Sequence, residues 1–240
     1  MLRTVEFSET SLIVTLLTRD FGRVSAMAKG ARRPKGPFEG SLDLLAVCRV
    51  VVIRKNADVL DLLTEAKLHR RFRGGEKSLE RTYAGYYVAE MLRLLTDDHD
   101  PNEELYELTL DTLGQIDGTG NVPIALLRFD AQSLRLLGHK PGIDDCTACG
   151  AEMTWGRRVA YSLRAGGVVC ESCKIRQHQL ISVRAEVIEL LRTIQAKDAA
   201  ICPLVDGGQY RELRVILNRT MQELLGKAPR MQSFLPTALH

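Results

Sequence analysis

Residues 146–173 read CTACGAEMTWGRRVAYSLRAGGVVCESC and carry two C-x-x-C pairs, Cys146 with Cys149 and Cys170 with Cys173. Twenty residues separate the inner cysteines of the two pairs. Each short turn presents two thiolates to one ion, and the intervening loop brings the second turn back to complete a tetrahedral site. The spacing therefore predicts a structural zinc ion. Because four sulfur ligands leave no position open for water, we expect this site to organise the fold and not to catalyse a reaction.

Two disulfides, or four buried thiols without a metal, are the alternative interpretations of the four cysteines. The apolar run at residues 12–17 is short, contains a threonine and lacks the pattern of a secretory leader. We therefore expect a reducing compartment, which disfavours disulfides and favours the metal. His139 and His178 flank the cysteines, and either is an alternative to one cysteine as a ligand.

The charge of the chain is concentrated near its beginning. The 240 residues are 45% hydrophobic and 26% charged, an ordinary globular composition, and no apolar run reaches the roughly 18 residues that a membrane helix needs. The net charge is only +3, but residues 19–35 hold six cations against Asp20 alone. These cations are Arg19, Arg23, Lys29, Arg32, Arg33 and Lys35. A partner with dense negative charge is expected at this segment.

The first 75 residues predict short β-strands. Residues 11–18 and 23–28 are rich in β-branched and alternating apolar residues around a turn with Gly22, which predicts a hairpin. The apolar run 44–53 and residues 59–66 predict a second pair of strands, and residues 29–40 an exposed loop. Four or five such strands favour a small closed barrel over an open sheet with unprotected edges.

Helical periodicity follows the glycines at 74 and 75. Apolar residues recur at intervals of three and four residues, and Ser78 and Ser182 are the expected caps of two helices. The predicted helices begin at residue 78, span 102–116 and 122–137, begin again at 182, and span 209–225. The predicted fold is therefore α+β, with an N-terminal barrel at residues 1–77 and an α-helical domain at 78–240. The zinc module is inserted in that domain at about residues 141–178.

Common catalytic motifs are absent from the sequence. It contains no G-x-x-x-x-G-K-[ST], no G-x-S-x-G and no H-E-x-x-H, and its acidic residues form no cluster that would hold magnesium. We therefore expect a binding protein and not an enzyme. An enzyme with an unusual arrangement of catalytic residues is the alternative.

Two clusters of cations are the candidate sites for a polyanion. Residues 29–37 place lysines and arginines among glycines, where side chains and backbone amides can approach phosphates, although a solvated face is the ordinary alternative. The second cluster, residues 67–73, holds Lys67, His69, Arg70, Arg71 and Arg73 around Phe72. Phe72 and Phe21 are expected to have a role in the core, with stacking on a base as the alternative. Charge is expected to contribute more than stacking.

Residues 9–33, ETSLIVTLLTRDFGRVSAMAKGARR, resemble the N-terminal signature of the RecO family of bacterial recombination mediators. Further likenesses follow in the family's order: LLTEA at 62–66, YVAE at 87–90, LLRF at 126–129 before Leu137-Gly138, Gly166-Gly167 before the second cysteine pair, and Phe234-Leu235. The resemblance covers almost the whole chain.

This resemblance implies an OB-fold barrel followed by a helical domain with a zinc knuckle. It implies a non-enzymatic protein of DNA damage repair and recombination that binds single- and double-stranded DNA without sequence specificity and anneals complementary strands. Its implied partners are RecR and single-strand-binding protein (SSB), since the family helps to load RecA on SSB-coated DNA. The implied location is the cytoplasm, at the nucleoid, with no membrane partner.

Residue by residue, the resemblance implies DNA contacts at the cations of its first motif and beside it: Arg23, Lys29, Arg32, Arg33 and Lys35. It implies zinc ligands at the four cysteines of the tetrad. Family members do not all keep these cysteines, which favours a structural role for the zinc. A zinc-ribbon regulatory factor that contacts nucleic acid through the knuckle is one alternative, and a protein-binding scaffold is another. The cations near the metal that support the first alternative are Arg157, Arg158, Arg164 and Lys174.

Overall fold

The computed structural model describes residues 1–33, 36, 38, 40–55, 59–154, 156–196 and 205–236. The chain forms two compact units, Met1–Gly120 and Asn121–His240. The first unit thus holds two long helices in addition to the strands, and the boundary drawn from the sequence at residues 77 and 78 stays a prediction. Among the described residues, no helix has both the length and the apolar character needed to cross a membrane.

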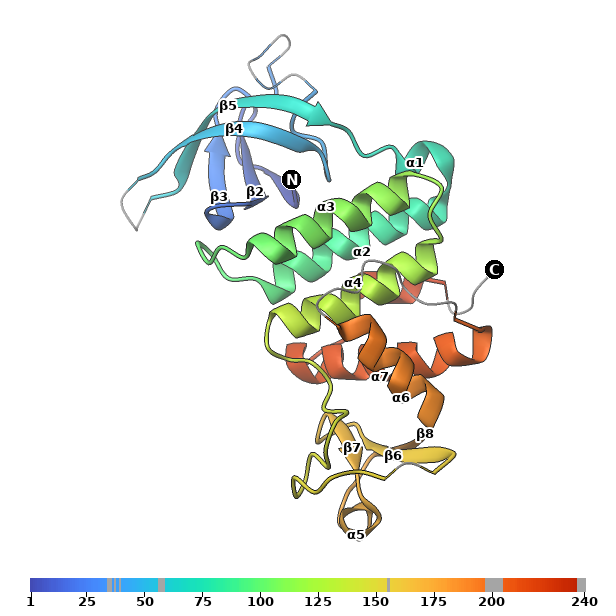
Figure 1. Cartoon of the computed structure of the whole chain (residues 1–240). Helices are drawn as coiled ribbons and strands as arrows, with labels where there is room; N and C mark the ends of the chain where they lie inside the picture. The colour runs from blue at the N-terminus through green and yellow to red at the C-terminus, as the bar shows by residue number, and fades with distance from the viewer. Residues whose placement is uncertain are drawn as a thin grey trace. The chain divides into compact units, whose positions relative to one another are not determined.

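Five strands form the sheet of the first unit (Figure 1). They are β1 (Arg3–Glu6), β2 (Leu12–Thr18), β3 (Gly22–Ala28), β4 (Val47–Ile53) and β5 (Asp61–Arg70). The order is β1-β2-β3-β5-β4, and all neighbours are antiparallel except β3 and β5. The predicted hairpin is confirmed as β2 and β3, and the second predicted pair as β4 and β5. The sequence does not predict β1, because its exposed residues lack alternation.

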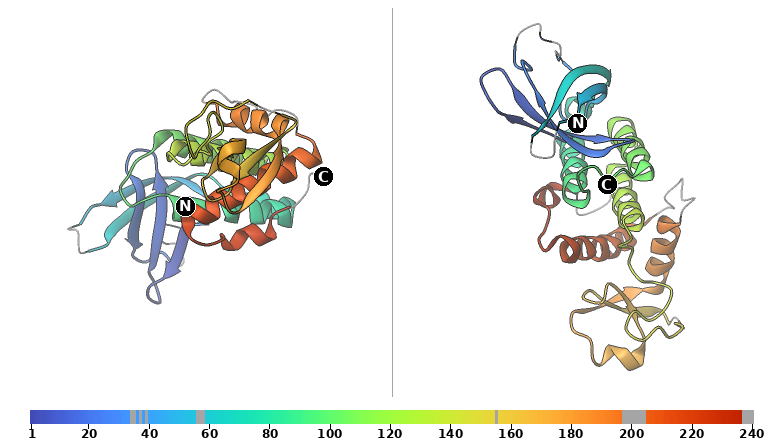
Figure 2. Two further views of the ribbon diagram at one scale, coloured as in Figure 1. Left: turned by 90° about the horizontal axis from the view of Figure 1, so that it is seen from below. Right: turned by 90° about the vertical axis from the view of Figure 1, so that its left-hand side faces the viewer.

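The two edges of the sheet approach each other at the start of the chain. The amino group of Met1 donates a hydrogen bond to the Ala46 carbonyl (3.0 Å), and the Leu45 N–H donates to the Met1 carbonyl (2.9 Å). The strands curl toward this contact, as the two views of Figure 2 show. The sheet is therefore OB-like, and the predicted fold class, an OB-like sheet region followed by a helical region, is confirmed.

The core of the sheet is built from alternate residues of the strands. Val14 and Leu16 of β2, Ala26 and Ala28 of β3, and Leu63 and Ala66 of β5 are buried together. Phe38, from the connection between β3 and β4, inserts its ring into the same core. A connection fixed in this way holds its neighbouring cations close to the sheet.

The first unit ends with the helices α1 (Gly74–Lys77), α2 (Leu79–Leu95) and α3 (Glu103–Asp117). The Ser78 hydroxyl caps α2 by accepting a hydrogen bond from the Arg81 N–H (3.2 Å), as predicted. The ring of Phe72 packs so closely on α2 that a β-carbon at Gly85 would lie 2.7 Å from it. The expected packing role of Phe72 is therefore confirmed.

The second unit is built on α4 (Val122–Leu136), α6 (Ala185–Gln195), α7 (Gly207–Leu225) and the 3-10 helix η1 (Arg230–Phe234). Asp206 caps α7 with hydrogen bonds from the N–H groups of Gly208 and Gln209. Asp130 of α4 is fully buried and accepts a hydrogen bond from Arg214 of α7 at 2.5 Å. This buried ion pair fixes α4 against α7.

A small sheet with the order β7-β6-β8 carries the cysteines, at the end of the second unit beyond α6 (Figure 1). Its strands are β6 (Arg158–Ser162), β7 (Gly167–Val169) and β8 (Leu180–Arg184), with the single turn α5 (Glu171–Lys174) after β7. The prediction that Ser182 begins a helix is wrong. Ser182 lies in β8, where its hydroxyl accepts a hydrogen bond from Arg158 (2.8 Å), and α6 begins at Ala185.

Candidate metal centre and nucleic-acid interface

The four predicted zinc ligands gather at one point. The Sγ atoms of Cys146, Cys149, Cys170 and Cys173 all lie within 4.8 Å of one another, and those of Cys149 and Cys170 are 3.8 Å apart. Zinc–sulfur bonds of about 2.3 Å in a tetrahedron separate the sulfur atoms by about 3.8 Å. The residues therefore fit a tetrahedral divalent metal. In the part of the chain that the structure describes, no histidine joins this group.

Backbone hydrogen bonds shape both cysteine turns. In the first, the Gly150 N–H donates to the Cys146 carbonyl (2.8 Å), and the Cys146 N–H donates to the Ala151 carbonyl (2.9 Å). Gly150 has a φ of 70°, a left-handed conformation that favours glycine. In the second, the Cys173 N–H donates to the Cys170 carbonyl (3.1 Å). Each turn thus points its two thiols in the same direction.

The glycine pair before the second turn allows the two turns to meet. The Thr147 N–H donates to the Val168 carbonyl (2.9 Å), which joins the first turn to β7. A β-carbon at Gly167 would lie 2.3 Å from the Gly142 carbonyl oxygen and 2.2 Å from the methyl carbon of Thr147. Only glycine can occupy position 167 where the chain passes Gly142 and Thr147 this closely. Gly167 therefore allows the first cysteine turn to pack against β7 beside the second.

The electrostatics of the thiols suit a cation. Burial raises the pKa of Cys146, but hydrogen bonds from the backbone N–H of Cys170 and from its own turn outweigh burial and lower this pKa to about 6. Hydrogen bonds with the thiols of Cys149 and Cys170 raise the pKa of Cys173 to about 12. Thiols this close cannot all ionise alone, whereas a divalent cation compensates their charges. The four cysteines are compatible with zinc, and such a site has no open coordination position.

Residues 29–40, the cationic loop, follow β3 in the connection to β4 and carry four of the eight predicted DNA contacts. Lys29, Arg32 and Arg33 are exposed, and Lys35 lies outside the described residues. The Arg32 N–H donates to the Thr10 carbonyl (3.1 Å), and the Arg33 N–H donates to the Gly30 carbonyl (3.0 Å). Together with the buried Phe38, these bonds fix the backbone from which the cations project.

The cations of the loop differ in their acidic neighbours. Within the described ranges, the side chains of Lys29 and Arg33 form no ion pair or hydrogen bond. Arg32 forms an ion pair with Glu6 of β1, with Nη1 3.1 Å from Oε2, and the two side chains are 39% and 73% exposed. Among the described residues, the loop therefore offers two cations without an acidic partner and one that a weak surface pair holds.

Arg23 has a different environment from the loop cations. Its Nε lies 2.7 Å from Oδ1 of Asp98, its Nη1 donates to the Arg93 carbonyl (2.6 Å), and its side chain is only 20% exposed. These bonds join β3 to the end of α2 within the first unit. A DNA contact by Arg23 stays a prediction, and its charge is already compensated.

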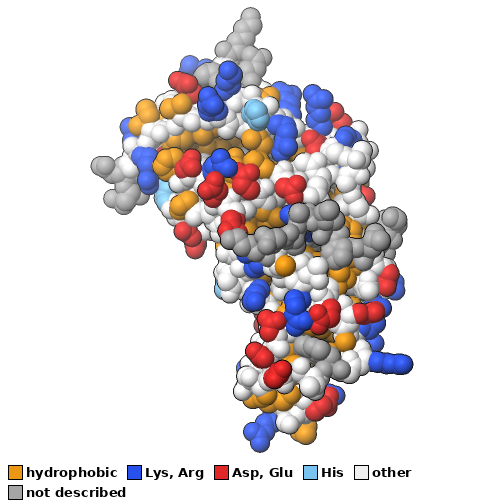
Figure 3. Space-filling model, in the orientation of Figure 1, with side chains coloured by type: hydrophobic (Ala, Val, Ile, Leu, Met, Phe, Trp, Pro, Cys, Tyr) orange, Lys and Arg blue, Asp and Glu red, His pale blue; other side chains and the backbone are white. Residues whose placement is uncertain are grey.

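The second predicted cluster follows β5. Arg71 donates to the Gly40 carbonyl (3.1 Å), which places it at the end of the cationic loop. Arg70 donates to the Leu110 carbonyl (3.3 Å), and Arg73 is exposed. Lys and Arg side chains gather over the upper part of the sheet around β4 and β5 (Figure 3). DNA contacts by these three arginines also stay predictions.

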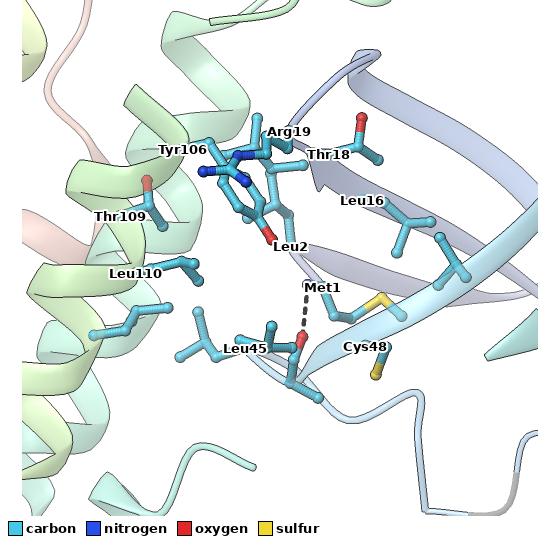
Figure 4. Close-up of a pocket in the computed structure, with 15 residues that line it drawn as sticks. Met1, Leu2, Leu16, Thr18, Arg19, Leu45, Cys48, Tyr106, Thr109 and Leu110 are labelled. Atoms are coloured by element: carbon cyan, nitrogen blue, oxygen red, sulfur yellow. Dashed lines mark hydrogen bonds between the residues drawn. The ribbon is translucent and has the colours of Figure 1, made fainter. Parts of the chain in front are cut away.

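Two hollows of the first unit adjoin the sheet. Phe21 is 59% exposed and borders one of about 310 Å³ with Val51 and His99, so the expected core role of Phe21 is wrong and its ring is accessible for stacking. The second, of about 140 Å³, lies between the sheet and α3, and Figure 4 shows Arg19 and Tyr106 at its wall and the buried amino group of Met1 within it. Burial lowers the pKa of that amino group to about 6.

Comparison with known proteins gives matches over nearly the whole chain. The family Recombination protein O N terminal matches residues 1–72, and the family Recombination protein O C terminal matches residues 76–233. A DNA repair protein RecO of Rhodopirellula baltica is 53% identical over all of this chain and 98% of its own length. Those of Myxococcus xanthus and Anaeromyxobacter dehalogenans (strain 2CP-C) are 30% and 31% identical over 98% of this chain, and over 94% and 93% of their own lengths.

Proposed function

This chain belongs to the RecO family of DNA repair proteins, and from that premise we propose that it is a recombination mediator that acts without enzymatic chemistry. It binds single- and double-stranded DNA through its first unit, without sequence specificity, and anneals complementary strands. It works with RecR to load RecA on DNA coated by SSB, in the cytoplasm at the nucleoid.

The observation that supports this proposal most is the cationic loop. Lys29 and Arg33 project from a backbone that hydrogen bonds and Phe38 fix to the sheet, and neither has an acidic partner among the described residues. Cations of this kind release counterions when they meet phosphates, which gives affinity with little sequence information. The loop can therefore hold a DNA backbone of any sequence.

Annealing follows from the same electrostatics. Two complementary strands repel each other, and a cationic surface that holds both by their phosphates screens this repulsion and raises their local concentration. Because the cations contact the phosphates and not the bases, the bases stay available for pairing. The process needs no nucleotide hydrolysis, in agreement with a sequence that lacks a phosphate-binding P-loop motif.

In this proposal the zinc stabilises the second unit and does not contact DNA. Two of the cations near the cysteines are already engaged: Arg158 donates to Ser182 (2.8 Å), and Lys174 lies 3.4 Å from Glu171. Arg164 and Arg176 are exposed and form no ion pair within the described residues. These two arginines therefore provide a matched test of the zinc-ribbon alternative.

The test compares Lys29→Gln/Arg33→Gln with Arg164→Gln/Arg176→Gln. Both double variants remove two exposed, unpaired charges. The first is expected to weaken binding to every DNA sequence about equally. It is also expected to lower the salt slope, which is the steepness with which log affinity for a single strand falls with log salt concentration, by about 1.4, or about 0.7 per lost phosphate contact. Fluorescence anisotropy over a salt series gives the slope, and an annealing assay with and without SSB gives the activity. A loss confined to the second variant would favour the zinc-ribbon factor and refute the proposal.

A further inference from the structure

Two cations face each other across the β4–β5 ladder. Arg49 of β4 is the direct partner of Lys67 of β5 in the antiparallel register, and both side chains are exposed. Like charges directly opposite in a ladder destabilise a sheet. Among the residues that the structure describes, neither side chain forms an ion pair or a hydrogen bond. The sheet therefore carries a repulsive pair that an anion between the two side chains would relieve.

The pair lines an open groove of about 740 Å³ within the first unit. His69 follows Lys67 on the same face of β5, and Arg19 and Tyr106 belong to the opposite wall. Figure 4 shows these last two side chains together at α3. Lys67 and His69 thus both border the groove from β5, and the ladder has an irregularity at His69.

Among the described residues, no acidic group around this groove forms an ion pair with Arg49 or Lys67. Glu107 of α3 lies 2.6 Å from Arg19, which also pairs with Glu103 (3.1 Å), so two carboxylates share this one arginine. Asp20 lines the groove, and Glu65 precedes Lys67 on its own strand face. Neither comes within ion-pair distance of Arg49 or Lys67, since no such pair forms among the described residues.

We propose that this groove binds the phosphate backbone of a second single DNA strand, while the cationic loop holds the first; the inference rests on the proposed function. Of the described residues that line the groove, none belongs to the loop. Annealing requires two strands to be held at once, and a single track of cations would offer only one. Arg49 and Lys67 lie opposite each other on neighbouring strands, an arrangement that lets both side chains contact one phosphate of an extended strand.

The experiment uses the full-length protein and the variant Arg49→Gln/Lys67→Gln, with Arg164→Gln/Arg176→Gln as the control of equal charge. Anisotropy with one labelled strand measures first-strand affinity, and energy transfer between complementary labelled strands measures annealing. We expect first-strand affinity within about twofold of wild type and an annealing rate lower by on the order of tenfold, the scale on which cationic surfaces raise local concentration. The single variant Arg49→Lys keeps the positive charge, and we expect it to anneal complementary strands at the wild-type rate.

Removing the repulsive pair should not lower the melting temperature of the DNA-free protein, so a folding defect is recognised independently. Annealing at the wild-type rate would overturn the second-strand site. An equal loss of first-strand affinity and annealing would also overturn it, because the groove would then belong to the first strand's path. Lost binding of a labelled oligoglutamate peptide, with annealing intact, would assign the groove to an acidic protein instead. A wild-type protein that binds no strand would refute the proposed function itself.

Discussion

Removal of one acidic side chain is predicted to strengthen DNA binding. Glu6 lies on β1, an edge strand whose residues are all exposed, and its carboxylate is 3.1 Å from the guanidinium of Arg32. In the variant Glu6→Gln the amide keeps the shape of the side chain and loses the charge. Arg32 then no longer exchanges a carboxylate for a phosphate when DNA binds.

The size of this gain follows from the exposure of the pair. The side chains are 39% and 73% exposed, so water and salt already screen their attraction. Pairs of this kind contribute about 0.2–1 kcal/mol, and release of that cost raises affinity by about 1.4- to 5-fold. The salt dependence becomes steeper at the same time, by at most about 0.7 in the slope for a single strand, if Arg32 gains one full phosphate contact.

The assay is fluorescence anisotropy with a labelled oligothymidine, titrated at several salt concentrations. Glu223→Gln is the matched control, because Glu223 is an exposed glutamate in the second unit and forms no ion pair among the described residues. Both variants change the net charge by the same amount. The difference between them isolates the neighbourhood of Arg32 from the charge of the whole protein.

Equal affinities and equal salt slopes for Glu6→Gln and Glu223→Gln would refute this reasoning. Such a result would mean that Arg32 makes no phosphate contact, and the DNA track would have to avoid the side of the cationic loop nearest β1. A weaker Glu6→Gln variant would mean that the ion pair positions Arg32 for binding.

Two further changes test the second unit. Cys149→Ser is expected to release the metal and lower the melting temperature, while the folded fraction keeps its DNA affinity because the cationic loop lies in the other compact unit. Metal analysis, thermal melting and fluorescence anisotropy measure these three quantities. Loss of DNA binding by a folded, metal-free variant would contradict this prediction. Asp130→Asn removes the carboxylate that pairs with the buried Arg214, and we expect it to lower the free energy of unfolding by about 3–5 kcal/mol, measured by urea denaturation. A loss of less than about 1 kcal/mol would show that the ion pair is not needed for stability.

Local patterns in the sequence predict much of this fold. The spacing of the four cysteines predicts their convergence, since two residues between thiols define a turn whatever surrounds it. The hairpin β2–β3 and the cap at Ser78 also depend only on neighbouring residues. Ser182 shows the limit of this reasoning. A serine before a helical pattern can also lie in a strand, and here the neighbouring strand β6 supplies Arg158, which donates a hydrogen bond to the Ser182 hydroxyl.

The state of each cation depends on residues far away in the chain. Arg23 and Asp98 are 75 positions apart, and no local pattern predicts that α2 ends beside β3. Arg49 stands as a single cation in an apolar stretch and draws no attention in the sequence, whereas Lys67 begins the second cationic cluster. The register of β4 against β5 makes them neighbours. The sequence thus predicts where cations are concentrated, but it does not predict which of them form ion pairs with acidic residues.

Exposure and pairing together rank the arginines and lysines as DNA ligands. Arg214 is buried with Asp130, and exchanging that carboxylate for a phosphate would break a buried ion pair in the core. The side chain of Arg23 is only 20% exposed and would lose packing as well as its exposed partner Asp98. Arg32 holds Glu6 only at the surface, where the exchange costs little. Among the described residues, Lys29 and Arg33 have no ion pair to give up, so a phosphate gains most from them, and they should contribute most to the salt dependence of binding.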